Sequence, residues 1–201
     1  KRQGMQIGQR VGGDMIKMIN RQLFGNDSTQ SLSKENFLAG FFAALDDKAL
    51  ASVDSASMYV NTKAEEIRTK AIEAQYADYK KENEAFLAEN KSKEGVKTTA
   101  SGLQYKVITE GKGEVPTAES RVKVNYKGTL IDGTEFDARE GMTFSAGHVI
   151  KGWTEALTMM PVGSKWELYV PQELAYGSSA TGKIKPFSTL IFEIELLEIE
   201  K

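Results

Sequence analysis

The sequence predicts an α+β protein with three parts: an N-terminal all-helical region, a long connecting helix, and a C-terminal antiparallel curved β-sheet wrapped on a short helix. Three observations support this. Apolar residues recur at helical spacing in the first 60 residues, residues 61–90 contain neither Gly nor Pro, and apolar and polar residues alternate beyond about residue 98. We therefore divide the chain into residues 1–60, 61–91 and 92–201.

Composition excludes several classes of function. The formal net charge of -2 argues against a nucleic-acid-binding protein, which usually has a basic surplus. No run approaches the ~18–20 apolar residues of a membrane span. The chain has no Cys and one His, His148, so we expect no metal site, no other cofactor and no His-based triad.

The first segment has glycines at every fourth position, at Gly4, Gly8 and Gly12, within a helical apolar pattern. Each glycine costs a helix up to ~1 kcal/mol relative to Ala, so their presence requires a reason. We predict that a second backbone approaches closely along this face. The alternative is a weakly helical, frayed end of the chain.

The next segment, "LSKENFLAGFFAALDD", predicts a helix that Ser33 caps at its N-terminus. Phe37, Phe41, Ala44 and Leu45 share one face of it, which is more apolar surface than two short helices can bury. A second copy of the segment would cover this face, so we predict a homodimer formed through residues 1–60. The alternative is that the C-terminal domain covers it.

Residues 61–90 predict a long polar helix, because 12 of these 30 residues are charged. At ~1.5 Å per residue such a helix would span roughly 45 Å. A helix that is polar almost all round usually bridges separate bodies through solvent. A coiled coil is the alternative, but no heptad pattern persists.

The C-terminal half alternates apolar and polar residues in the manner of strands, with a turn near Asp132-Gly133. Between the strands, "GWTEALTMMPVG" has helical spacing and ends at Pro161. This pattern predicts a short helix against one face of an antiparallel sheet. We assign five residues to the core: Leu103, Val124, Leu157, Leu190 and Ile194.

The segment "FDAREGMTFSAGHVIKGW", residues 136–153, contains two Phe, an Asp, a Val-Ile pair and a Trp. No nucleophile lies beside a base in this segment, so it predicts a lined pocket without covalent chemistry. The alternative is that these residues are plain core.

Three further stretches carry a family resemblance: "VKVNYKGTLIDGTEFDA", "VIKGWTEALTMMPVGSKWELYVPQELAYG" and "STLIFEIELLEI". Together they resemble the FKBP-type peptidyl-prolyl cis-trans isomerases over essentially all of residues 102–201. The helical half is similar to the dimeric bacterial branch of macrophage infectivity potentiator type. "FLAENKSKEGV" followed by "SGLQYKVI" is typical of the junction between the two halves in that branch.

The resemblance implies an isomerase that assists protein folding by acting on X-Pro bonds of unfolded or folding polypeptides, and that binds FK506-like macrolides. It also implies a periplasmic or outer-membrane-associated location, and because the chain opens at Lys1 we expect a leader to have been removed. One alternative is a holdase-type chaperone in which isomerase activity is secondary. Another is a structural dimer whose pocket is degenerate.

The resemblance also assigns roles to residues. Trp153 would form the floor for the proline ring, the Ile150 N–H and the Tyr176 hydroxyl would bind carbonyls, and Asp137 would position the twisting carbonyl without acting as a general base. Met142 stands where some members carry an aromatic residue, which affects the preference for the residue before proline and the affinity for macrolides. The implied catalytic residues are Phe136, Asp137, Trp153 and Tyr176, and the implied substrate-binding residues are Tyr126, Phe144, Val149, Ile150, Ile184 and Phe192.

Overall fold

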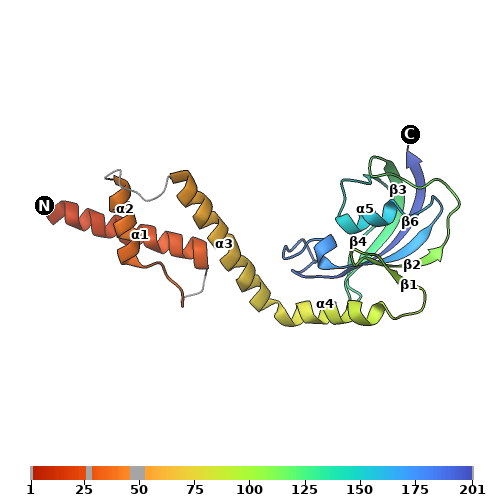
Figure 1. Ribbon diagram of the computed structural model, residues 1–201, viewed down its shortest axis with the longest axis horizontal. Coiled ribbons are helices and arrows are strands. Elements are labelled where there is room, and N and C mark those ends of the chain that lie inside the picture. The colour runs from red at the N-terminus through yellow and green to blue at the C-terminus, as the bar shows by residue number, and fades with distance from the viewer. Residues whose placement is uncertain (1, 26–28, 46–52, 201) are drawn as a thin grey trace. The chain divides into compact units, whose positions relative to one another are not determined.

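The computed structural model describes residues 2–25, 29–45 and 53–200 (Figure 1). The chain divides into two compact units, Lys1–Ile72 and Glu73–Lys201. The first is helical and the second holds the sheet, so the α+β prediction is confirmed. Among the described residues, no helix has both the length and the apolar character that crossing a membrane requires.

The helical unit contains α1 (Arg2–Phe24), α2 (Lys34–Leu45) and most of α3 (Val53–Gln75). Ser33 caps α2 as predicted, because its hydroxyl oxygen accepts a hydrogen bond of 3.3 Å from the N–H of Asn36. The Leu32 N–H donates to the Asn20 side chain at 2.8 Å, which fastens the segment before α2 to α1.

The close approach of a second backbone along α1 and the covering of the apolar face of α2 by a second copy both stay predictions. The surroundings of Gly4, Gly8 and Gly12 lie outside the described part of the structure, and so do the side chains of Phe41 and Phe42. Two methionine side chains that are described are exposed within a single chain: Met18 of α1 at 64% and Met58 of α3 at 72%. Both helices therefore present apolar surface to solvent when the chain is alone.

The segment expected as one helix over residues 61–90 holds two helices, α3 and α4 (Ala77–Asn90). They are separated at Tyr76, whose backbone angles of φ -109° and ψ 16° lie outside the helical region. Neither Gly nor Pro marks this break in the sequence. Two side chains of α4, those of Asn83 and Asn90, are buried, and tertiary contacts of this kind can override helix propensity.

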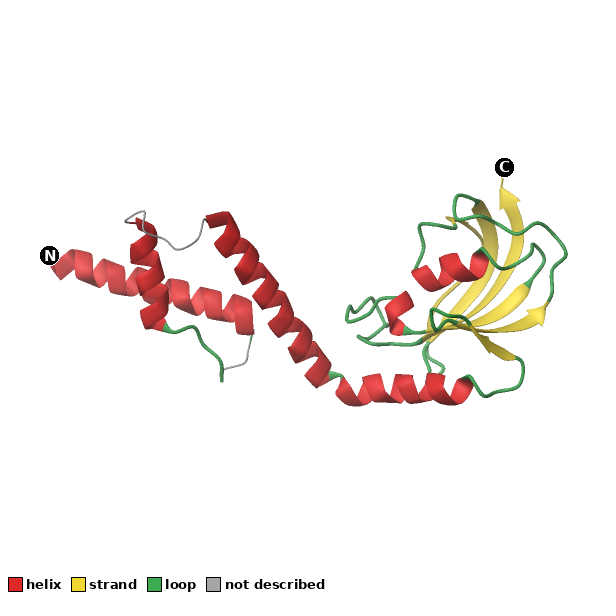
Figure 2. Cartoon of the chain, in the orientation of Figure 1, coloured by secondary structure: helices red, strands yellow, loops and turns green. Residues whose placement is uncertain are grey.

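The second unit is built on a six-stranded, wholly antiparallel sheet with the order β1-β2-β5-β6-β3-β4 (Figure 2). The short helix α5 (Lys151–Leu157) lies on one face of this sheet, and a 3-10 turn (Gln172–Leu174) follows β5. The strands are β1 (Val96–Thr98), β2 (Gln104–Thr109), β3 (Arg121–Thr129), β4 (Glu135–Ser145), β5 (Lys165–Val170) and β6 (Leu190–Glu200).

The core lies between the sheet and α5. All five residues assigned to it from the sequence, Leu103, Val124, Leu157, Leu190 and Ile194, are fully buried, which confirms those assignments. The predicted turn is also present, with the Leu130 N–H donating to the Thr134 carbonyl at 2.9 Å. Gly133 adopts φ +83°, a conformation that favours glycine.

The position of α5 depends on close packing at Gly152. A Cβ at this residue would lie 2.5 Å from Cγ1 of Val170 on β5, so only glycine lets the helix approach the sheet this closely. The next residue along the helix, Trp153, is consequently held against the sheet and is only 4% exposed.

Candidate active site

One pocket, with a volume of about 370 Å³, brings together all ten residues that were predicted to form the site. Its walls come from β3, β4, α5 and β6, from the segment between β4 and α5, and from the loop between β5 and β6, so segments far apart in sequence meet here. Its lining residues are Tyr126, Phe136, Asp137, Phe144, Val149, Ile150, Trp153, Tyr176, Thr181, Gly182, Lys183, Ile184 and Phe192.

The indole of Trp153 is surrounded by three aromatic rings that meet it edge to face. The ring centroids of Tyr126, Phe144 and Phe192 lie 5.0, 5.5 and 5.2 Å from that of Trp153, with interplanar angles of 82°, 84° and 81°. This is the arrangement that aromatic quadrupoles favour. The indole N–H is buried and has no hydrogen-bond partner among the described residues.

A second pair of rings extends the aromatic wall. Phe136 of β4 packs edge-on against Phe192 of β6 at 5.5 Å and 88°. Between these strands, Gly128 of β3 supplies the space, since a Cβ there would lie 2.5 Å from Phe136 Cζ and 2.9 Å from Phe192 Cε1. The absence of a side chain at this position is therefore what allows both rings to reach the pocket.

Asp137 is fixed by two partners. Its Oδ2 accepts a 2.5 Å hydrogen bond from the Tyr126 hydroxyl, and its Oδ1 lies 3.5 Å from Nε of Arg139. Burial, followed by the hydrogen bond to Asp137 and the charge of that carboxylate, raises the pKa of Tyr126 to about 12. Tyr126 therefore stays protonated and donates to Asp137 throughout the neutral range.

Two further polar groups of the lining have no protein partner among the described residues: the backbone N–H of Ile150 and the hydroxyl of Tyr176. Ile150 immediately precedes α5, and its carbonyl accepts from the N–H groups of Trp153 and Thr154. Tyr176 is 39% exposed and lies just after the 3-10 turn. Both groups are thus available to donate a hydrogen bond to a ligand carbonyl.

The loop of residues 175–187 contributes the remaining wall. Gly177 and Gly182 have φ values of +56° and +55°, and Thr181 pairs with Ile184 in an isolated bridge. The Lys183 ammonium donates to the Glu135 carbonyl at 3.0 Å, which links the loop to the start of β4.

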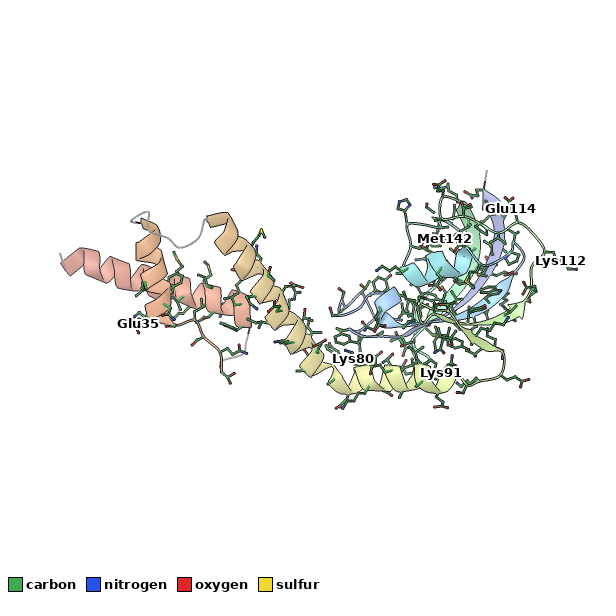
Figure 3. The ribbon with its side chains drawn as sticks, viewed as in Figure 1. Glu35, Lys80, Lys91, Lys112, Glu114 and Met142 are labelled. Carbon is green, nitrogen blue, oxygen red and sulfur yellow. The ribbon has the colours of Figure 1, made fainter. Side chains whose placement is uncertain are left out.

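Two residues singled out from the sequence lie outside the lining. His148 is exposed, and its Nδ1 lies 3.0 Å from the Ser145 hydroxyl. Met142, labelled in Figure 3, is 40% exposed on β4. Neither residue belongs to the pocket walls described above.

The sequence did not predict the contacts that Arg139 and Lys183 make at the site. Arg139 lies directly opposite Tyr126 in the pairing of β3 with β4, so the strand register could have identified it. Lys183 reaches Glu135 only because the loop folds back over the sheet, and no periodicity in the sequence reports that path.

Two family models match the chain. The one described as "FKBP-type peptidyl-prolyl cis-trans isomerase" covers residues 112–197, which include every residue of the pocket. The one described as "Domain amino terminal to FKBP-type peptidyl-prolyl isomerase" covers residues 2–107.

Similar curated proteins carry related names. The FKBP-type 22 kDa peptidyl-prolyl cis-trans isomerase of Escherichia coli is 43% identical over 98% of this chain and 91% of its own length. The outer membrane protein MIP of Legionella longbeachae is 51% identical over 61% of this chain, and the match spans 54% of that relative. The chain thus matches nearly all of the first relative and about half of the second.

Two solved structures are similar as well. The crystal structure of FkpA from Escherichia coli covers 100% of this chain and 96% of its own, at 33% identity and a TM-score of 0.63. The peptidyl-prolyl cis-trans isomerase of Pseudomonas syringae covers 63% of this chain and 96% of its own, at 41% identity and a TM-score of 0.60.

Proposed function

The chain belongs to the family of FKBP-type peptidyl-prolyl cis-trans isomerases and is an enzyme of that class, and we propose that it carries out its reaction in the pocket above Trp153. The observation that carries this proposal is the convergence of all ten expected side chains on one aromatic pocket within the matched residues 112–197. The names of the matched family models and of the first relative favour the isomerase over the holdase alternative.

The reaction needs no bond to be broken. Rotation about a peptide bond faces a barrier of ~18–20 kcal/mol, because the planar amide must lose its conjugation. The cis and trans forms before proline differ by only ~0.5–1 kcal/mol, so the enzyme has only to lower the barrier. The planar amide is more polar than the twisted amide, and an apolar pocket therefore favours the twisted form.

Each wall of the pocket has a role in this mechanism. The face of the Trp153 indole receives the proline ring, and the rings of Tyr126, Phe144 and Phe192 hold that indole upright by edge-on contact. Phe136 and the aliphatic side chains of the pocket exclude water around the rotating bond. These aliphatic side chains are those of Val149, Ile150 and Ile184.

The polar groups of the pocket bind the substrate backbone on either side of its proline. The Ile150 N–H and the Tyr176 hydroxyl donate to substrate carbonyls, so the rotation takes place within a fixed backbone frame. Asp137 does not take a proton in this mechanism. It fixes the Tyr126 ring through the 2.5 Å hydrogen bond and places a negative charge beside the twisting carbonyl.

The test compares the two tryptophans, which are equally buried at 4% exposure. Trp166 stacks on Tyr105 at 4.5 Å and does not line the pocket, so it is a matched control for loss of an indole. In a protease-coupled assay with a short Leu-Pro peptide, Trp153→Leu is expected to lower kcat/KM by at least about tenfold. Trp166→Leu is expected to keep most of the activity.

A wild-type value of kcat/KM for Trp153→Leu, or an equal loss in Trp166→Leu, would contradict the site assignment. The same assay with FK506 added tests the macrolide prediction, and inhibition of the wild-type chain is the expected result. The aromatic lining and the two free donors support that prediction.

The substrates are proline-containing polypeptides, and the finer assignments of partner and place remain proposals. A homodimer through residues 1–60 is supported by the glycine spacing of α1 and the apolar sequence of α2. A periplasmic or outer-membrane-associated location is supported by the name of the Legionella longbeachae relative, outer membrane protein MIP.

A further inference from the structure

Helix α4 contacts the rest of its unit through buried polar side chains, and also through Phe86, whose ring centroid lies 6.2 Å from that of Tyr169 on β5. Among the described residues, six polar side chains are buried, and all but Ser164 lie where α4 meets the sheet or the loop beside it. The five are Asn83, Asn90, Gln104, Ser188 and Thr189. Hydrogen bonds of this kind fix the register of a contact, because a shifted helix would leave buried polar groups unpaired.

The two ends of α4 hold different parts of the domain. At its C-terminal end, Asn90 donates to the Gln104 side chain at 3.0 Å, and Gln104 donates to the Leu87 carbonyl at 2.9 Å. This end is therefore fastened to β2, away from the pocket. Lys80 and Lys91, labelled in Figure 3, mark the two ends of the helix.

The N-terminal end of α4 holds the segment that ends the β5–β6 loop. The Asn83 side-chain oxygen accepts from the Thr189 N–H at 2.8 Å, and its amide group donates to the Tyr79 carbonyl at 2.8 Å. The Tyr79 and Ser188 hydroxyls lie 3.1 Å apart. Because Ser188 already donates to the Lys185 carbonyl at 2.7 Å, Tyr79 is the donor in that pair.

The segment held by α4 includes a strained residue. Phe187 is not glycine, yet its φ is +64°, and it is only 4% exposed. Such a backbone conformation persists only where its surroundings hold it. The Lys80 ammonium lies 5.0 Å from the Phe187 ring centroid, so α4 supplies part of that support.

The same residue connects α4 to the pocket. The Phe187 N–H donates to the Gly177 carbonyl at 2.8 Å, which joins the two ends of the loop next to Tyr176. Ile184, three residues before Phe187, lines the pocket and is only 6% exposed. A chain of contacts thus runs from Asn83 through Thr189 and Phe187 to the loop residues of the pocket.

We propose that Tyr79, Lys80 and Asn83 of α4 are positioning residues for the isomerase reaction. By holding residues 187–189, they fix the loop so that the Tyr176 hydroxyl and the Ile184 side chain stand ready for the substrate. The proposal rests on the function proposed above for this pocket. It makes α4 part of the catalytic unit, in contrast to the purely connecting role that the sequence predicts for it.

The test uses the full-length chain and compares the two ends of the helix. Asn83→Ala removes the acceptor for Thr189, and Tyr79→Phe removes one hydroxyl while keeping the ring. Asn90→Ala is the matched control, since Asn90 is also buried on the same helix but its side chain donates to Gln104 of β2. For each variant we would measure kcat and KM for a Leu-Pro peptide, amide hydrogen exchange over residues 176–188, and stability by tryptophan fluorescence.

A loop that spends only a fraction of its time in the competent position weakens apparent binding by that fraction. For Asn83→Ala we therefore expect KM to rise by about fivefold or more, with a smaller change in kcat. Exchange over residues 176–188 is expected to be faster in that variant. Tyr79→Phe is expected to shift both measurements in the same direction, and Asn90→Ala to lower stability without changing KM or exchange in the loop.

Unchanged KM and loop exchange in a folded Asn83→Ala variant would overturn the proposal, and so would an equal rise of KM in Asn90→Ala. If Asn83→Ala does not fold, Tyr79→Phe decides by the same two measurements. A failure of the proposed function would appear separately, as unimpaired activity in Trp153→Leu. The exchange measurement does not depend on catalysis.

Discussion

Tyr126 has two roles in the site, one carried by its ring and one by its hydroxyl. Its ring packs against Trp153 at 5.0 Å, and its hydroxyl binds Asp137 at 2.5 Å. The family resemblance assigns Tyr126 to the wall and Asp137 to the carbonyl, but the bond between them depends on the register in which β3 pairs with β4. Residue identity alone does not contain that register.

The raised pKa of Tyr126 makes a prediction about stability at high pH. Its folded pKa is about 12, above the value of about 10 for an unfolded chain. Between these two values the folded protein keeps a proton that the unfolded chain has lost, so ionisation of the unfolded state lowers the free energy of unfolding as pH rises. Urea unfolding at about pH 9, below that interval, and at about pH 11, inside it, should show a smaller loss of stability in Tyr126→Phe than in the wild-type chain.

An equal loss of stability in the two proteins would contradict the burial of the Tyr126 hydroxyl and its hydrogen bond to Asp137. Tyr169, whose pKa is also raised, is present in both proteins and cancels from the comparison.

At the scale of elements, the site depends on how β3, β4 and β6 pack side by side. Gly128 of β3 lies beneath the rings of Phe136 and Phe192, with no space for a Cβ. We predict that Gly128→Ala displaces both rings and lowers kcat/KM by about tenfold or more. Near-ultraviolet circular dichroism would report the disturbed aromatic packing.

The Gly128→Ala variant is also expected to be destabilised, by about 1–3 kcal/mol, because an overpacked core cannot relax fully. The two tryptophans both lie in the second unit, so their fluorescence follows the unfolding of that unit. A Gly128→Ala variant with wild-type activity and wild-type stability would contradict the close contact between Gly128 and the rings of Phe136 and Phe192.

The sequence predicted the elements of the sheet domain well because their signals are local. Alternation placed Val124, Leu190 and Ile194 in the core, and the Asp-Gly pair located the turn. It did not predict the break at Tyr76, which no Gly or Pro marks. It also did not predict the docking of α4, because Asn83 reads as one more polar residue on a polar helix until its partner Thr189 is known.

The site shows the same difference between features that the sequence signals and contacts that only the fold creates. The ten pocket residues were identified together because the order of several segments along the chain matches a family pattern. The contribution of Lys183 was not, because its partner is a backbone carbonyl that side-chain identity does not report. Positions of side chains were thus predictable from resemblance, whereas the contacts of loops with backbone groups required coordinates.

At the scale of the whole molecule, the two units differ in how far they bury their own apolar side chains. The sheet unit buries its own core, while the helical unit leaves Met18 and Met58 exposed in a single chain. We predict that a second copy covers the helical unit. Light scattering at micromolar concentration should then give twice the chain mass of 22.2 kDa.

A mass equal to one chain over the whole micromolar range would rule out a stable dimer. As a control on the surface involved, Met18→Lys and Met58→Lys can be compared with Met159→Lys, which alters a methionine of the sheet unit that is 37% exposed. If the dimer forms through the helical unit, only substitutions there are expected to lower the mass.

The place of β2 in the strand order has a practical consequence for the expression of truncated fragments. A fragment reduced to residues 112–197 would retain every pocket side chain, yet it would lose the strand that separates β5 from solvent. The backbone of β5 would become an unpaired edge, and the face of Trp166 that stacks on Tyr105 would be left bare. Such a truncation invites edge-to-edge aggregation during expression, whereas a cut upstream of α4 leaves that strand protected.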